Sequence, residues 1–244
     1  MARSLAVVAG GGIALSIICL AAAAALGGNG LLDLPFGSFF SSCRAVDSDG
    51  SNSREFAWED PGDDVAINVP ARVLYKRGSG DVLVASGPAE MLDHLRVRGG
   101  RIDFDCGAMF RRGRLDLTLP GRAFSDFSVN GSGTLTLEDI NQPRLTITIR
   151  GSGKASATGT AEEVDLSIAG SGDADFGKLA AKRVDINIAG SGNADVAPEE
   201  AASVNIAGSG KIRLLKQPRS LETHIAGSGR IINAPSTPSA PAAK

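Results

Sequence analysis

The chain has 244 residues, of which 43% are hydrophobic and 5% aromatic, and it contains 31 glycines. This length fits one large domain or two small ones, and the composition favours thin layers packed from small side chains. The formal net charge of −2 lacks the basic excess that phosphate contacts require, so no nucleic-acid partner is expected.

The N-terminal segment, residues 1–28, predicts export. Arg3 is the last charged residue before Asp33, and residues 5–26 form an apolar run. The run is long enough to span a bilayer, but its alanines also suit a cleavage site, so it is either a signal peptide or a membrane anchor. Its length favours a retained transmembrane anchor. With Arg3 cytoplasmic, the rest lies on the periplasmic face of the inner membrane if anchored, and is otherwise periplasmic or secreted.

Two cysteines, Cys43 and Cys106, follow the apolar run. In an oxidising compartment we expect them to pair as a disulfide, with two unpaired thiols as the alternative. Together with two histidines they make no zinc-binding spacing, so no metal or cofactor is expected.

Residues 29–53 are expected to form a linker, and residues 54–120 an irregular β region that caps or begins the repeat after it. VAINV, RVLYK, DVLVA and RLDLTLP predict strands, and LRVRGGRIDF predicts a hairpin turning at Gly99-Gly100. This region also holds a cluster of arginines. The cluster suggests contacts with anionic polysaccharide or lipid headgroups, or a charged edge that discourages strand pairing. Its members are Arg96, Arg98, Arg101, Arg111, Arg112 and Arg114.

A repeat built on the triplet GSG dominates the rest of the chain. Six triplets recur at intervals of 18 to 20 residues, and a seventh, at Gly78, lies outside the series. The six begin at Gly131, Gly151, Gly170, Gly190, Gly208 and Gly227. Apolar and polar residues alternate on both sides of each triplet, which is typical of half-buried strands joined by a glycine corner. A nearly constant period indicates stacked rungs. The sequence therefore predicts an all-β fold, with residues 121–234 as a right-handed parallel β-helix or related β-solenoid. Residues 235–244, rich in Pro, Ala and Ser, are expected to be a disordered tail.

Three sets of polar positions in the repeat are candidate sites. The column Ser167, Asn187, Asn205 and His224 is either a flat binding surface or an ordinary solvent face. The carboxylates Asp173, Asp175 and Asp195 suggest calcium, but a solvated acidic face is the favoured interpretation. Asp165 and Asp185 have a spacing that suits glycoside hydrolysis, yet they recur with the repeat and no Trp or Tyr accompanies them. No catalytic residue is assigned.

A family resemblance follows from the order of three segments. VLVASGPAEMLDHLRVRGGRIDF, then RLDLTLPGRAFSDFSVNGSG, then the GSG triplets together resemble the GIN-type autotransporter adhesin head domain, over residues 54–233. The resemblance implies a β-helix-like fold in a secreted or membrane-anchored bacterial envelope protein, and it brings no catalytic residues.

The sequence thus predicts a non-enzymatic exported β-solenoid for adhesion or cell-envelope interaction, with an envelope polysaccharide or a surface protein as partner. The alternative is a carbohydrate-active enzyme, a polysaccharide lyase or hydrolase, on the same scaffold. The oligomeric state is left open.

Overall fold

The computed structural model describes residues 51–59, 62–105 and 113–233, all within one compact unit. The predicted signal or anchor segment, the two cysteines of the predicted disulfide and the predicted C-terminal tail lie outside these ranges. In the described part of the chain, no helix is long and apolar enough to cross a membrane.

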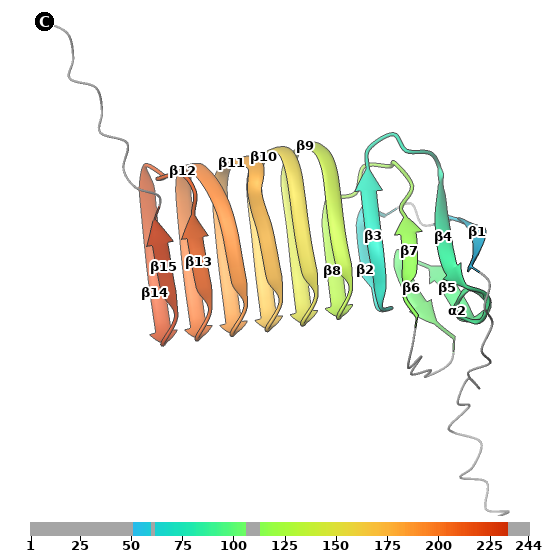
Figure 1. Ribbon diagram of the computed structural model, residues 1–244. Helices are drawn as coiled ribbons and strands as arrows, with labels where there is room; N and C mark the ends of the chain where they lie inside the picture. Colours follow the sequence, from blue (N-terminus) through green and yellow to red (C-terminus); the bar gives the residue numbers. More distant parts are fainter. Residues whose placement is uncertain (1–50, 60–61, 106–112, 234–244) are drawn as a thin grey trace, which may run out of the picture. The chain divides into compact units, whose positions relative to one another are not determined.

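The GSG repeat forms a β-solenoid, which confirms the predicted fold class (Figure 1). Four long strands each run from one GSG corner to the next: β9 (Thr134–Gly151), β10 (Lys154–Gly170), β11 (Asp173–Gly190) and β12 (Asn193–Gly208). They are parallel and in register, so Ile188 lies between Ile168 and Ile206. Four shorter strands flank them: β8 (Asp126–Gly131), β13 (Lys211–Leu214), β14 (Ser220–Gly227) and β15 (Arg230–Asn233).

The GSG corner requires glycine at two positions, for a different reason at each. In the six regular triplets the first glycine has a positive φ, from 100° at Gly131 to 135° at Gly208, which only glycine adopts without strain. The third glycine leaves room for the apolar residue that precedes the previous triplet: a Cβ on Gly172 would lie 2.6 Å from Ile149 Cγ2. The same contact recurs at 2.6 to 2.9 Å from Gly153 to Gly229. The apolar side chain of each rung therefore packs against the third glycine of the next corner.

The predicted alternation of inward and outward residues is confirmed in the central rungs. Ile188 and Ile206 are 2% and 0% exposed, whereas Asn187 and Asn205, one residue before each, are exposed. Burying such side chains supplies the main driving force for the coil, at roughly 25 cal/mol per Å² of apolar surface removed from water.

The N-terminal strands extend the solenoid in an order that differs from their order along the chain. β2 (Asp64–Ile67) and β3 (Ala71–Lys76) form a rung, with β8 and β9 on one side of it. On its other side lie β6 (Arg101–Phe104) and β7 (Leu115–Thr118), also parallel. The first rung in the sequence is therefore an inner rung of the coil.

Antiparallel strands and one short helix cover this end. β4 (Val82–Pro88) pairs with β7, and β1 (Ser51–Ala57) pairs with β4. The predicted hairpin is confirmed: β5 (Leu95–Arg98) pairs with β6 across Gly99-Gly100, and both glycines have positive φ. The helix α2 (Ala89–His94), which the sequence analysis did not predict, buries Met91 and Leu92. The N-terminal end of the core is thus closed.

Candidate functional site

A hollow of about 620 Å³ lies over the strands that follow the GSG corners. Most of the side chains that line it lie three or five residues after the first glycine of a triplet, because these positions point outward on successive parallel strands. Its lining residues are Thr134, Lys154, Ala155, Ser156, Asp173, Ala174, Asp175, Asn193, Asp195, Lys211, Arg213 and Ile232. The hollow thus extends across several rungs and suits an elongated ligand.

Opposite charges on neighbouring rungs form ion pairs at two places in this hollow. Lys154 Nζ lies 3.1 Å from Asp173 Oδ2, and Asn193 Nδ2 donates a hydrogen bond of 2.9 Å to Asp173 Oδ1. The hydrogen bond from Asn193, followed by the contact with Lys154, lowers the pKa of Asp173 against the opposing effect of burial. Arg213 binds Asp195 with two guanidinium nitrogens, the Nε–Oδ1 distance being 2.6 Å. The hollow therefore combines fixed donors and acceptors without a large net charge.

The sequence alone does not assign the basic side chains of this hollow to a site. It favours a solvated acidic face for Asp173, Asp175 and Asp195, but Lys154 pairs with Asp173 and Arg213 pairs with Asp195. Alignment on the first glycine of the triplets carries the signal. It places Lys154 level with Asp173 and Arg213 level with Asp195.

The predicted polar column lies on the strands that precede the corners. Ser167, Asn187, Asn205 and His224 are neighbours in register and all exposed, and Asn205 Nδ2 donates to Asn187 Oδ1 at 3.4 Å. None of the four lines the hollow. The structure therefore brings these residues together, but on a different part of each rung.

Three carboxylates gather beside that column. One oxygen from each of Glu163, Asp165 and Asp185 lies within 4.8 Å of the others, so the group could hold a cation. Arg144 Nη2 lies 2.6 Å from Glu163 Oε2 and neutralises one charge. Partial burial, followed by repulsion from Glu163, raises the pKa of Asp165. Calcium usually takes six to eight oxygens, and Glu163 is already paired with Arg144, so this group is a weak calcium site.

The six arginines of the predicted cluster have different surroundings. Arg111 and Arg112 lie outside the described ranges. Arg98 and Arg114 are exposed, and Arg101 Nε lies 3.8 Å from Asp103 Oδ2.

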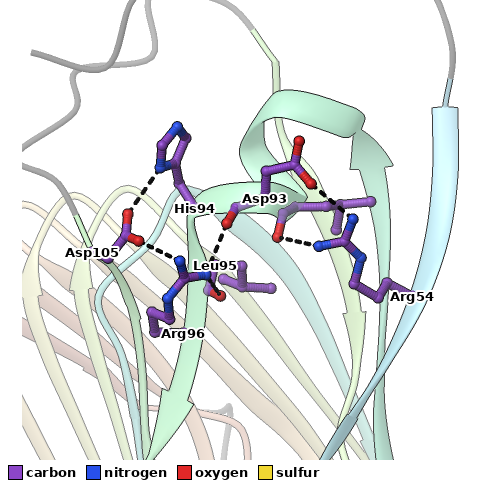
Figure 2. A network of polar contacts seen from close by, with 7 residues as sticks. Arg54, Asp93, His94, Leu95, Arg96 and Asp105 are labelled. Carbon is purple, nitrogen blue, oxygen red and sulfur yellow. Dashed lines mark hydrogen bonds and ion pairs between the residues drawn. The ribbon is translucent and has the colours of Figure 1, made fainter.

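Arg96 belongs to the polar network of the cap (Figure 2). It donates to the carbonyls of Asp93 and Leu95, both at 2.8 Å, and forms an ion pair with Asp105. His94 Nδ1 lies 2.9 Å from the other Asp105 oxygen. The His94 contact, more than that of Arg96, lowers the pKa of Asp105. Arg96 therefore holds the hairpin to the end of α2.

The model of one protein family matches residues 89–218, which is more than half of the chain. That family is described as "Putative auto-transporter adhesin, head GIN domain". The chain belongs to this family. The GIN-domain match begins at α2 and ends before β14, so it includes the hollow from Thr134 to Arg213 and the network around Arg96.

One solved structure supports this fold, and two others are similar to the chain. A putative adhesin from Bacteroides fragilis NCTC 9343 is 17% identical, with a TM-score of 0.58, and the match covers 76% of this chain and 98% of that one. A putative adhesin from Parabacteroides merdae ATCC 43184 is 13% identical, with a TM-score of 0.48 and coverage of 77% and 97%. A putative lipid binding protein from Parabacteroides distasonis ATCC 8503 is 18% identical, with a TM-score of 0.47 and coverage of 77% and 98%. No curated protein matches this chain at a significant level.

Proposed function

We propose that this GIN domain is a non-enzymatic, exported binding module of the adhesin type, and that its hollow binds an extended envelope polysaccharide. Family membership supports an exported, envelope-associated protein, and the N-terminal apolar run supports presentation on the periplasmic face of the inner membrane. The observation that carries the proposal is the hollow, with polar side chains repeated on successive rungs.

The charge pattern of the hollow favours a neutral or zwitterionic glycan over a polyanion. Lys154 and Arg213 each face a carboxylate within the hollow. The third cation, Lys211, is matched in number by Asp175, so little unbalanced positive charge remains to attract sulfates or phosphates. Sugar hydroxyls both donate and accept hydrogen bonds, and can therefore bridge such pairs. Rungs about 4.8 Å apart offer equivalent partners along a repeating polymer.

Calorimetric titration of neutral, zwitterionic and acidic polysaccharides tests this proposal. Asn193→Ala and Arg213→Gln each remove donors from the hollow, and Ser167→Ala, on the exposed polar column, is the matched control. Hydrogen bonds that involve charged groups contribute about 1.5–3 kcal/mol, so Arg213→Gln should weaken binding roughly tenfold or more. Binding that is confined to acidic polymers, or that is unchanged in both hollow variants, would contradict the proposal.

A carbohydrate-active enzyme is the second candidate function, favoured by Asp165. A raised pKa is what a glycosidase requires of its general acid, and Asp185 places a second carboxylate beside Asp165. The same titration samples decide between the two functions. Release of new reducing ends that is abolished by Asp165→Asn supports catalysis, and binding without release supports the adhesin-type module.

A further inference from the structure

The last described rung of the solenoid has an edge to which no described strand is added. Among the described strands, β14 pairs only with β12, and β15 pairs only with β13 (Figure 1). At the other end of the coil, β1, β4 and α2 cover the outermost rung. The outer side of β14 therefore presents backbone donors and acceptors to which a further strand can add.

The core is also incomplete at this edge. Ile225 occupies the same inward position as Ile206, yet it is 41% exposed where Ile206 is 0% exposed. Leu221 lies beside the buried Ala202 and is 38% exposed. Both side chains face the interior of the coil, where no described rung stacks on them. The described part of a single copy therefore leaves the last layer of its core in water, which disfavours that state.

We propose that β14 pairs antiparallel with β14 of a second copy, around a twofold axis that passes beside Thr223. Directly opposed residues of antiparallel strands point to the same face of the sheet. With Thr223 opposite itself, Leu221 lies opposite Ile225 of the second copy, and Glu222 lies opposite His224 of the second copy. The pairing continues the core on the inner face and places a carboxylate against an imidazole on the outer face.

The sequence of β14 selects this register over its neighbours. A shift of two residues in one direction places Glu222 against Glu222 of the second copy, and like charges directly opposite are destabilising. A shift in the other direction places His224 against itself and leaves Glu222 opposite Ala226. A shift of one residue turns Leu221 and Ile225 to the outer face. Only the register centred on Thr223 matches apolar with apolar and acid with imidazole.

A second copy in the same orientation is a poorer occupant of this edge. In such a head-to-tail contact β14 would face β5, the outermost described strand of the same sheet, where Arg98 is exposed and Arg96 is ion-paired with Asp105. Their polar side chains do not complement Leu221 and Ile225. A head-to-tail contact also leaves one open edge at every step and builds a filament, whereas the twofold contact closes.

Cysteine crosslinking of the full-length chain, purified from the cell fraction in which it is found, tests the twofold axis. Oxidised Thr223→Cys should give a disulfide-linked dimer above the background of the wild type, whose native cysteines are unchanged. His224→Cys is the register control: its counterpart on the second copy is two residues away along the strand, too far for a disulfide. A mixture of Glu222→Cys and His224→Cys should crosslink. Thr223→Cys at background level, or His224→Cys crosslinking equally well, would overturn the proposal.

Sedimentation velocity tests the same contact without a covalent bond. The wild type should be a dimer that dissociates on dilution. Glu222→Lys should raise the dissociation constant about threefold to tenfold, because two symmetry-related pairs are lost, and Glu222→Lys/His224→Glu should restore it. Both residues are exposed, so the melting curve at low concentration should not change. A wild type that is monomeric at every concentration, or that grows beyond a dimer, rules out the closed twofold pair.

Discussion

The third glycine of one GSG triplet contacts the apolar residue of the previous rung. The free energy that couples these two positions can be measured with one pair of residues. A Cβ on Gly153 would lie 2.8 Å from Val129 Cγ1 and 3.1 Å from the Gly133 carbonyl oxygen. Ordinary contacts begin at 3.4 Å, so Gly153→Ala overpacks the corner, chiefly against the valine. Such overpacking lowers the free energy of unfolding by about 1–3 kcal/mol.

Val129→Ala removes the methyl group that causes this overlap. Val129 is 0% exposed, so the single variant should lose about 2 kcal/mol of unfolding free energy. In the double variant the alanine on Gly153 fills part of the space that the valine left. The two losses should therefore not add, and the coupling between them should be at least about 1 kcal/mol in favour of the double variant.

Denaturant unfolding followed by circular dichroism gives the four free energies of this cycle. Gly133→Ala is the matched control, since the nearest atoms to its added Cβ, including Val129 Cγ1, lie at 3.4 Å. That variant should be nearly neutral. Additive losses in the cycle, or a Gly133→Ala variant as unstable as Gly153→Ala, would refute the account of the GSG triplet as a lock between rungs.

Three further predictions concern burial and pH. Ile188→Asp places a carboxylate in the core and should unfold the central rungs in hydrogen-exchange measurements, whereas the outward Asn187→Asp should melt like the wild type. Asp165 has a raised pKa in the folded chain, so its charge lowers stability as pH rises through that pKa; Asp165→Asn should melt higher at pH 7, with the gain vanishing below about pH 4. Asp105 has a lowered pKa, so its charge stabilises the folded state above about pH 4 and this stabilisation is lost in acid. Hydrogen exchange in α2 should therefore speed up as the pH falls, and Asp105→Asn should abolish this pH dependence.

The periodic part of the fold could be predicted because each rung repeats the same inward positions. The positions of Ile168, Ile188 and Ile206 relative to their glycines are identical, and all three are buried. The same alignment predicts an inward Ile225, but not its 41% exposure, because exposure depends on whether another rung stacks above it.

The N-terminal rungs could not be predicted from the repeat. The corner between β2 and β3, at residues 68–70, carries no GSG triplet, so nothing in its sequence aligns it with the rung after it. The helix α2 spans only six residues, too few for a helical period to emerge from the apolar pattern. The order of these rungs depends on contacts between segments far apart in the chain.

The candidate hollow could be predicted in part. Lys154 and Asp173 share one position of the repeat, and Asp195 and Arg213 share another, so their pairing follows once the rungs are stacked. Considered one repeat at a time, the same residues are isolated surface charges. Whether these residues pair depends on the register of the rungs, which the glycines set.

The order of the rungs also determines how the molecule can grow during synthesis. β2 and β3 leave the ribosome before either of their neighbours, and β4 to β7 complete the closed end by Thr118, before the regular series of GSG triplets begins at Gly131. The repeat is therefore synthesised onto a finished template that exposes one growing edge, at β2 and β3. Each later turn needs only the turn before it. Assembly runs in one direction, from the cap toward β15, and a chain interrupted within the repeat ends as a shorter coil with an intact cap.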